Sequence, residues 1–225
     1  MQWQDTDILE VKPLSNTIIQ VLLKPKQYTD YMAGQYLQIK TIHFENYFSI
    51  ANAPIGNSFY ECHIRHDTLN PSSQELLQHI QEYRHLKIRL PFGRCYLEQL
   101  DSSKPIIFIA GGTGFAPIKS MIEMMLFQND ARSFECYWGA KTQSDLYWQE
   151  QLHQYQNHTP LFKHLACVID DDLLKQVLEH HPNDLNAYQF VLSGPFEMVF
   201  KYRDRLLSAG VKLEFMHADA FEFKT

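Results

Sequence analysis

The sequence has only four cysteines, and they form no cluster. Cys62, Cys95, Cys136 and Cys167 are spread almost evenly over the 225 residues. Cysteine-ligated zinc sites and iron–sulfur clusters need closely spaced thiolates, as in C-x-x-C or C-x4-C-x2-C, and neither pattern occurs. We therefore expect neither within this chain and interpret the cysteines as small buried thiols.

The 11 histidines also lack a metal-binding spacing. No H-E-x-x-H motif is present, and His180 and His181 fall at the end of a predicted helix, where a solvated role is sufficient. We therefore expect no metal site.

An excess of positive charge, long apolar stretches and a leader-like N-terminus are missing too. The formal net charge is −6, which disfavours nucleic acid as the main partner. No stretch reaches the roughly 18 apolar residues of a membrane span. The first five residues have neither the basic residues nor the apolar core of a signal peptide. The sequence thus predicts a cytoplasmic protein without a membrane span.

What the sequence does contain is a glycine-rich turn between a strand pattern and a helix pattern. Five apolar residues follow Pro105, then come Gly111, Gly112 and Gly114, and apolar residues recur with helical spacing over 118–126. Such a turn can hold a phosphate on free backbone N–H groups at the start of a helix. It predicts a dinucleotide site, and an ordinary tight turn is the alternative.

The turn departs from the usual G-x-G-x-x-G fingerprint in two ways. Pro117 takes the place of the third glycine, where it suits the first helical position. After the next predicted strand, Gly139, Ala140 and Lys141 stand where an acidic residue normally holds the adenosine ribose.

The first hundred residues read as a small antiparallel barrel. Turn residues separate short strand patterns, and Ser72 and Glu75 form the pattern of a capping box that starts one helix. The predicted strands are 17–23, 35–40, 47–51, 59–65 and 86–90. We assign residues 1–100 to this domain.

After a polar stretch at 99–104, strands and helices alternate strictly. The predicted strands are 106–110, 134–138, 164–169, 189–193 and 212–217, and the helices are 117–128, 144–155, 171–180 and 195–209. This alternation predicts a doubly wound parallel sheet with helices on both faces, over residues 104–225. The predicted fold class is therefore two-domain, β plus α/β. A hydride donor on the sheet needs an acceptor nearby, and a flavin held by the barrel would fit.

Six segments resemble, in the same order, motifs of the ferredoxin–NADP reductase superfamily, and most closely those of the bacterial NAD(P)H:flavin oxidoreductases. The resemblance covers nearly the whole chain. It rests on the A-G-Q-Y turn at 33–36, the flavin-ring strand at 47–54, the dinucleotide loop at 111–117, the second NAD-domain signature at 137–140 and 145–147, the G-P-x-x-M turn at 193–198, and the C-terminal segment at 219–223.

The resemblance implies roles for individual residues. Phe48 would pack near the flavin ring, Ser49 would hydrogen-bond near its N5, and Thr113 would lie where nicotinamide and flavin meet. Ser49 and Thr113 are thus the predicted catalytic residues. The alternatives are a strand serine bonded to backbone and a helix cap. The predicted cofactor-binding set is Asn46, Tyr47, Phe48, Ser49, Ile50, His63, Ile64, Arg65, Ser72, Ser73, Gly111, Gly112, Thr113, Gly114, Phe115, Pro117, Trp138, Gly139, Lys141, Ser193, Gly194, Pro195, Met198 and Phe221.

Two departures from the family pattern weaken the expected binding of a flavin phosphate. Asn46 stands where the family has an arginine, and an amide cannot replace a bidentate charged contact. In the stretch 70–73, where related proteins bind the FAD pyrophosphate, Pro71 removes one N–H donor. We expect flavin (FMN, FAD or riboflavin) to bind loosely, through its ring, and to leave reduced. Alternatively, Arg65 or His63 supplies the missing charge and FAD stays bound.

The resemblance implies hydride transfer from NADH or NADPH to a flavin. The reduced flavin would then be released and used by a monooxygenase or for the reduction of a ferric complex. One alternative is an FAD-holding component that passes electrons to a partner such as an oxygenase. Another is an idle nucleotide-binding regulator. Because no acid ends the second strand, we expect both nicotinamide donors to work, and Lys141 could face a 2′-phosphate. Arg65 could equally be a surface charge, and Phe221 a core residue.

Overall fold

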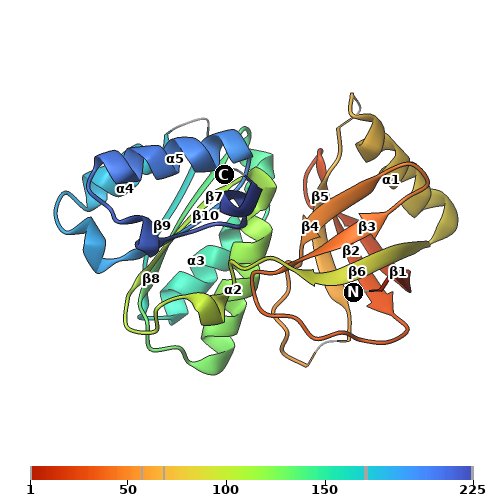
Figure 1. Ribbon diagram of the computed structural model, residues 1–225, viewed down its shortest axis with the longest axis horizontal. Coiled ribbons are helices and arrows are strands. Elements are labelled where there is room, and N and C mark those ends of the chain that lie inside the picture. Colours follow the sequence, from red (N-terminus) through yellow and green to blue (C-terminus); the bar gives the residue numbers. More distant parts are fainter. Residues whose placement is uncertain (1, 57, 68, 170–171, 224–225) are drawn as a thin grey trace.

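The computed structural model describes residues 2–56, 58–67, 69–169 and 172–223. Two β-sheets organise them, a 6-stranded antiparallel sheet from the first part of the chain and a 5-stranded parallel sheet from the second. In Figure 1 the two lie side by side, and helix α2 (Phe115–Gln128) is on the side of the parallel sheet that faces the barrel. The predicted fold class is confirmed.

The antiparallel sheet curves into a small barrel. Residues Ile50 and Cys62 form a bridge that connects its two edge strands, β4 and β5. One face of each strand fills a common apolar core, and helix α1 (Pro71–Tyr83) buries Leu76 and Ile80 against it. The strands follow the spatial order β4 (Glu45–Ser49), β3 (Tyr36–Lys40), β6 (His85–Phe92), β1 (Gln4–Pro13), β2 (Ile18–Pro25) and β5 (Tyr60–Arg65).

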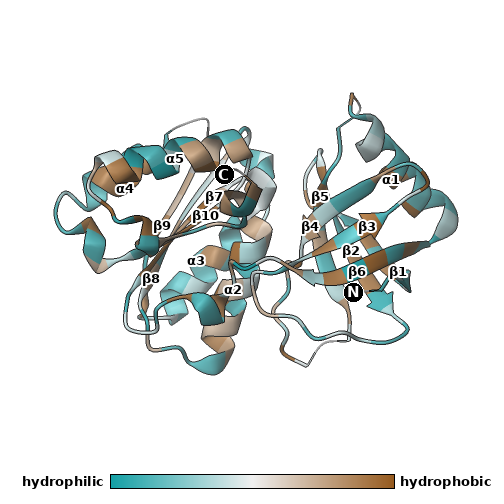
Figure 2. Ribbon diagram, in the orientation of Figure 1, coloured by the Kyte–Doolittle hydropathy of each residue, from teal (hydrophilic) through white to brown (hydrophobic). Residues whose placement is uncertain are grey.

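The parallel sheet carries two helices on each face. Along β7, Phe108 points into the core under α2 and α3, and Ile109 points into the core under α4 and α5. The strands are accordingly hydrophobic on both faces. Figure 2 shows brown, hydrophobic residues along the strands of this sheet. The spatial order is β11 (Met216–His217), β10 (Gln189–Ser193), β7 (Ile106–Gly111), β8 (Phe134–Ala140) and β9 (Phe162–Ile169). The other helices are α3 (Gln149–His158), α4 (Leu173–His180) and α5 (Phe196–Ser208).

The first strand of the barrel, β1, was not predicted. Its sequence QDTDILEVKP carries charged residues at most exposed positions, and only Thr6 and Ile8 are buried. A strand with so little apolar surface lacks the alternating pattern that marks a strand in sequence. Its pairing with β2 and β6 creates the element.

Three predicted elements begin or extend differently. The helix expected at 144–155 is a short 3-10 turn at Gln143–Asp145 followed by α3, which begins at Gln149. The strand expected at 212–217 is mostly a 3-10 turn, and only Met216–His217 pair with β10. The expected helix start at Asp171 lies outside the described residues, and α4 begins at Leu173.

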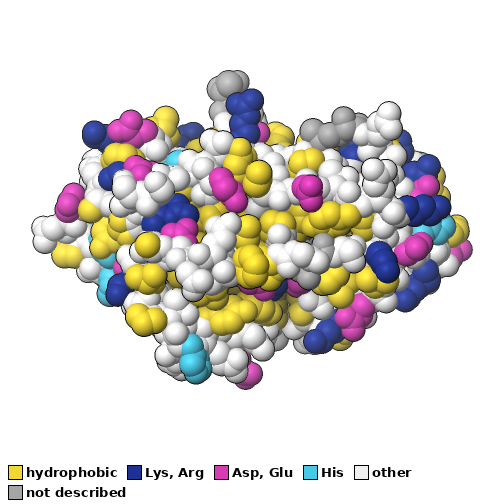
Figure 3. Space-filling view, turned by 90° about the horizontal axis from the view of Figure 1, so that it is seen from below, with side chains coloured by type: hydrophobic (Ala, Val, Ile, Leu, Met, Phe, Trp, Pro, Cys, Tyr) yellow, Lys and Arg dark blue, Asp and Glu magenta, His cyan; other side chains and the backbone are white. Residues whose placement is uncertain are grey.

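The 3-10 turn Leu97–Gln99 and a polar turn after it connect the two sheets, where the boundary at residues 100–104 is predicted. On the face seen in Figure 3, acidic and basic side chains are interspersed rather than separated by sign. Within the described ranges, no helix is long and apolar enough to cross a lipid bilayer.

Candidate active site

A large cleft lies between the barrel and the parallel sheet and has a volume of about 1040 Å³. Barrel residues such as Tyr47 and Ser49 line one wall, and Gly111 and Ser193, at the carboxyl ends of β7 and β10, line the other. Ligands of parallel α/β sheets bind outside the carboxyl ends of the strands. Small-molecule sites usually enclose roughly 300–1,000 Å³, so this cleft has room for a dinucleotide and a second ring.

Most residues of the predicted cofactor-binding set line this cleft, including both predicted catalytic residues. Ser49 belongs to the barrel wall and Thr113 to the wall of the parallel sheet. The predicted residues in the lining are Tyr47, Phe48, Ser49, His63, Arg65, Gly111, Gly112, Thr113, Gly114, Pro117, Gly139, Lys141, Ser193, Gly194, Pro195 and Met198. Their contact with a cofactor stays a prediction.

The barrel wall is made of side chains. Ser49 ends β4, and its hydroxyl takes part in none of the hydrogen bonds between described residues. The ring of Tyr36 contacts Tyr47 edge-on at 5.5 Å and stacks on Phe92 at 5.7 Å. This aromatic rim suits a flat conjugated ring, and the unpaired Ser49 hydroxyl is available to a ligand.

The opposite wall is made largely of backbone. The 3-10 turn Gly112–Gly114 joins β7 directly to α2, and no side chain caps that helix. The Trp138 indole N–H donates to the Gly112 carbonyl at 2.9 Å, which holds the turn against β8. The sequence predicts Pro117 at the first position of this helix, but α2 begins at Phe115 and Pro117 is its third residue. Pro117 has no N–H, and the Phe115 N–H already bonds the Gly112 carbonyl, so the start of α2 leaves fewer donors for a phosphate than an ordinary helix start does.

Two glycines let the turns of this wall pack closely. A Cβ on Gly114 would lie 2.5 Å from the backbone carbonyl of Ser193, and a Cβ on Gly111 would lie 2.6 Å from the sulfur of Met198. The G-P-x-x-M turn before α5 therefore packs directly against the glycine-rich turn. Larger residues at these positions would separate the two.

Some predicted residues lie behind the walls instead of in the lining. Ile50 and Ile64 are fully buried in the barrel core. Phe115 stacks on Trp138 at 4.1 Å beneath the glycine-rich turn, and Phe221 packs near Phe200 at 6.1 Å. These side chains support the walls, which fits the core alternative for Phe221.

His63 and Arg65 line the cleft, but both are already paired. The His63 ring lies 2.7 Å from Glu61 and 2.9 Å from the Tyr147 hydroxyl, and burial lowers its pKa. The Arg65 guanidinium bonds Thr17 at 3.1 Å and lies 3.4 Å from Asp145 in the second domain, beside Gly112. Neither side chain is therefore free to replace the family arginine, and Arg65 is ion-paired rather than a plain surface charge.

Asn46 and Ser72 lie together outside the lining of the cleft. The Ser72 hydroxyl donates to the Asn46 carbonyl oxygen at 3.1 Å. The Asn46 amide nitrogen is buried and has no acceptor among the described residues. A buried donor without a partner is costly, so this nitrogen fits an acceptor oxygen of a ligand such as a flavin phosphate. It would bring no charge.

The predicted capping box at Ser72 and Glu75 is wrong. Asn70 caps α1 and accepts from the N–H groups of Ser72 and Ser73 at 3.0 and 3.2 Å, with Pro71 in the first turn. The Glu75 carboxylate instead accepts from the His43 N–H at 2.9 Å. Because Asn70 occupies the donors at this helix start, they are not free for a pyrophosphate.

The far end of the cleft contains an acid that the sequence did not reveal. Asp172, the N-cap of α4, lines the cleft together with Lys141 and Lys201 and pairs with Arg205. The lack of an acid after the second strand thus does not leave this end without a carboxylate. Asp172 would disfavour a 2′-phosphate, and the two lysines would favour one.

Asp219 was also missed, although it begins the C-terminal segment that resembles the flavin reductases. It lines the cleft and accepts from the N–H groups of Arg94 and Cys95 at 2.8 and 2.9 Å. Burial raises the pKa of Asp219 to about 6. Titratable groups with shifted pKa values cluster at functional sites, and the resemblance at 219–223 was the signal that could have identified it.

The histidine pair has a different environment from the one predicted. His181 is buried and bonds the Glu135 carboxylate at 2.9 Å, so a solvated role is wrong for this residue. Tyr137 donates to the same carboxylate oxygen at 2.9 Å. Potential ligand atoms of Glu135, His180 and His181 lie within 4.8 Å of one another. The group lies near the amino end of β8, away from the cleft.

The four cysteines are free thiols. Cys62 and Cys136 are buried as predicted, whereas Cys95 and Cys167 are half-buried. Burial raises the pKa of Cys95, which lines the cleft, so its thiol stays protonated at neutral pH.

Comparisons with known proteins agree with this architecture. The oxidoreductase NAD-binding domain family matches residues 108–204. An NAD(P)H-flavin reductase of Vibrio harveyi is 28% identical over 233 residues, covering 96% of this chain and 97% of its own. A CDP-6-deoxy-L-threo-D-glycero-4-hexulose-3-dehydrase reductase of Yersinia pestis is 30% identical over 213 residues, covering 91% of this chain. This chain spans 64% of the length of that relative.

Solved structures show the same fold. A cytochrome P450 reductase of Amycolatopsis superposes with a TM-score of 0.86 at 21% identity, covering 97% of this chain and 69% of its own. A ferredoxin NADP+ reductase of Neisseria gonorrhoeae, solved with FAD and NADP, gives 0.81 at 15% identity, covering 97% and 99%.

A barrel that faces the carboxyl ends of a parallel sheet across one cleft defines the class of two-domain, dinucleotide-dependent oxidoreductases. Together with the sequence relatives, it supports the resemblance to the ferredoxin–NADP reductase superfamily, among relatives named flavin reductases.

Proposed function

We propose that this chain is an NAD(P)H:flavin oxidoreductase that reduces FMN, FAD or riboflavin and releases the reduced flavin. The observation that carries this proposal is the placement of Ser49 and Thr113 on opposite walls of one cleft. The NAD(P)H-flavin reductase of Vibrio harveyi, whose length this chain almost fully spans, supports it.

When bound, the nicotinamide and the flavin supply the hydride transfer themselves, so no general base is required. The chain's contribution is to bind and orient the two rings. The glycine-rich turn Gly112–Gly114 would bring its backbone close to a phosphate, and the aromatic rim around Tyr36 and Tyr47 would cover a ring. The Ser49 hydroxyl can donate a hydrogen bond to a ring nitrogen and hold a proton beside it.

Loose binding of the flavin follows from the paired state of the charged groups around the site. Asn46 brings no charge, Asn70 occupies the N–H groups at the start of α1, and Arg65 and His63 are held by Asp145 and Glu61. A flavin would therefore be held mainly by its ring. This favours a flavin that acts as a substrate over a permanently bound FAD.

A visible spectrum of the purified protein, followed by NADH and NADPH oxidation assays with and without added flavin, tests the proposal. We expect colourless protein that oxidises NAD(P)H only when FMN, FAD or riboflavin is added. Protein with flavin bands at a 1:1 ratio that is reduced without added flavin would overturn the substrate role. No oxidation under either condition would overturn the reductase assignment.

The second candidate is a reductase component that holds FAD and passes electrons to an oxygenase. It is favoured by a relative named terephthalate 1,2-dioxygenase reductase component 1 of Comamonas, 30% identical over 203 residues, covering 84% of this chain and 59% of its own. Stoichiometric FAD after purification would support this candidate, and the acceptor would then be a partner protein. Ferric complexes are a further downstream acceptor, reduced by the released flavin.

A further inference from the structure

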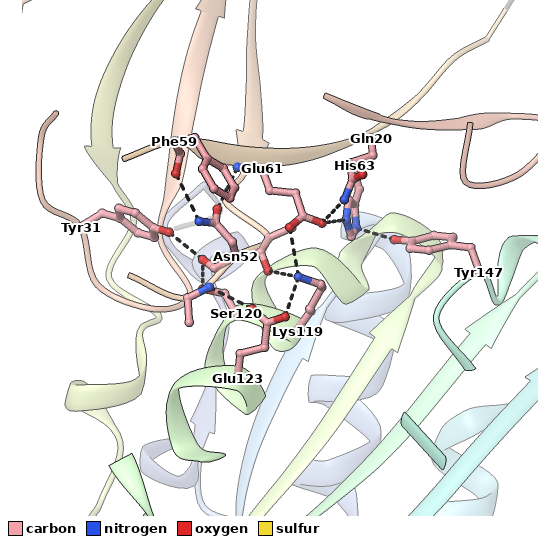
Figure 4. A network of polar contacts seen from close by, with 12 residues as sticks. Gln20, Tyr31, Asn52, Phe59, Glu61, His63, Lys119, Ser120, Glu123 and Tyr147 are labelled. Atoms are coloured by element: carbon pink, nitrogen blue, oxygen red, sulfur yellow. Dashed lines mark hydrogen bonds and ion pairs between the residues drawn. The ribbon is translucent and has the colours of Figure 1, made fainter. Parts of the chain in front are cut away.

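Side chains of helix α2 hydrogen-bond the backbone of residues 51–53, shortly after Ser49. The side chains Lys119, Ser120 and Glu123 reach three consecutive residues of the barrel, as Figure 4 shows. Lys119 donates to the carbonyl of Ala51 at 3.2 Å, and Ser120 donates to the carbonyl of Asn52 at 2.8 Å. Glu123 accepts from the N–H of Ala53 at 3.0 Å. We call these three side chains of α2 the clamp.

Each of the two predicted catalytic residues is close in sequence to one side of the clamp. Ser49 lies two residues before Ala51, whose carbonyl accepts from Lys119, and Thr113 lies in the turn that leads directly into α2. Helix α2 thus links the wall of the parallel sheet, at Thr113, to the barrel residues that follow Ser49 in the chain. Displacing α2 along its axis by even part of its 5.4 Å pitch would break all three contacts at once.

Lys119 is the centre of the clamp. Only 4% of its side chain is exposed, and its ammonium group lies 2.8 Å from Glu123 and 3.2 Å from Glu61. It also lies 4.8 Å from the Trp148 ring centre. A buried ammonium persists only when carboxylates and carbonyls compensate for its lost hydration. The position of Lys119 therefore depends on both domains.

Glu61 extends the network to the wall of the cleft. Burial alone would raise the pKa of Glu61, but the hydrogen bond from His63 and the charge of Lys119 lower it to about 2. Gln20 also donates to this carboxylate at 2.7 Å. Because an ionised carboxylate only accepts hydrogen bonds, the His63 Nε2–H donates to it, and burial keeps His63 neutral. Its Nδ1 then accepts from Tyr147 of the second domain.

We propose that the clamp fixes the distance and angle between the two walls of the cleft, with Lys119 as its principal positioning residue for hydride transfer. This inference rests on the proposed function. A misplacement of about 1 Å between reacting groups can lower a rate about 100-fold while leaving binding intact.

Lys119→Met tests the proposal, because methionine keeps most of the length and apolar volume but loses the charge and the donors. We expect the rate of flavin reduction by NADH in single turnover to fall by about 10- to 100-fold. The KM values for NADH and riboflavin should change less than about threefold, and Lys119→Arg should restore part of the rate. Lys175→Met is the matched control, since Lys175 also pairs with a glutamate four residues later but on the exposed surface of α4. A wild-type reduction rate in Lys119→Met would overturn the proposal.

Loss of Lys119 leaves the buried carboxylate of Glu61 and the half-buried carboxylate of Glu123 without their cation and could unfold the chain. Two further variants avoid this, Lys119→Met/Glu123→Gln, which restores the charge balance, and Ser120→Ala, which removes one neutral hydrogen bond. We expect both to fold and to reduce flavin more slowly, Ser120→Ala by about threefold to tenfold. Unchanged rates in both would contradict the positioning role.

Hydrogen exchange separates failure of this inference from failure of the proposed function. We expect faster exchange of the amides at 51–53 and at 113–116 in Lys119→Met but not in Lys175→Met. This readout does not require activity. A wild-type chain that oxidises no NAD(P)H would overturn the reductase assignment, and with it the catalytic part of this inference. Unchanged exchange at both segments would overturn the clamp itself.

Discussion

The two walls of the cleft are built from different materials. The wall of the parallel sheet is backbone, where Gly111, Gly112 and Gly114 and the turn before α5 pack closely. The barrel wall is side chain, with aromatic rings and the Ser49 hydroxyl, while its Arg65 is paired with Asp145 and its His63 is bonded to Glu61. A backbone site fixes its ligand's phosphates by geometry, whereas a side-chain wall can lose one contact and still hold a ring. We expect the first wall to be intolerant of change and the second to be tunable.

Gly114→Ala should have the largest effect, because it breaks the backbone wall. The φ of Gly114 is −59°, which alanine adopts without strain. Its Cβ would nevertheless lie 2.5 Å from the Ser193 carbonyl, which cannot move without displacing β10. We expect NADH oxidation to fall more than about 100-fold, since the turn must open and disturb the alignment of the bound rings.

Gly210→Ala is the control for that experiment. Gly210 has a φ of +87° but open space around it, so alanine there meets backbone strain without a clash. We expect a loss of about 1 kcal/mol in the free energy of unfolding and unchanged kinetics. Normal NADH kinetics in Gly114→Ala would show that the close approach to Ser193 has no role in the site.

Ser49→Ala should come next, because it removes one contact from the side-chain wall. A hydrogen bond that strengthens in the transition state contributes about 1.5–3 kcal/mol, or roughly 10- to 100-fold in rate. We expect stopped-flow flavin reduction to slow by this factor while flavin and NADH still bind. Ser208→Ala, at an exposed helix position, is the control. A rate within twofold of wild type would assign Ser49 a structural role only.

The same contrast explains how much could be predicted from sequence. Strand β10 was predicted at the residues where it lies, because a buried parallel strand is an apolar run between turn residues. The barrel was harder, since strand β1 is mostly polar and forms through long-range pairing. The helix expected at 144–155 was misplaced because Asp145 is held by Ser15 and Thr17, far away in sequence.

For the site, motif order identified both walls, including Ser49 and Thr113. It did not reveal Asp172 or Asp219, because each reaches the cleft only through the folding of a later segment onto an earlier one. Nor could it show that Asn70 rather than Ser72 caps α1, although a proline at the first helical position is a known sign of such a cap.

Asp219→Asn should change how the free energy of unfolding depends on pH. The pKa of Asp219 is raised from 3.8 to about 6, so the folded state binds this proton more tightly than the unfolded state does. Wild-type stability should therefore fall as the pH rises from about 4 to about 6 and level off above, by about 1–3 kcal/mol. Asp219→Asn should lack this loss. Urea unfolding of both proteins between pH 4 and 7 measures it, and parallel curves would show that Asp219 titrates normally.

Asn46→Arg should have the smallest effect and sharpens the comparison most, because it adds beside the barrel wall the charge that the family arginine provides. A charge-assisted hydrogen bond to phosphate should lower the KM for FMN and FAD about tenfold. Riboflavin has no phosphate and serves as the internal control, so its KM should stay unchanged. The kinetics of each flavin, measured at saturating NADH, give the three values. Equal improvement for all three flavins would mean that the arginine acts on the ring or on the fold. No change for FMN and FAD would mean that position 46 does not face the phosphate and that the unpaired Asn46 amide serves another acceptor.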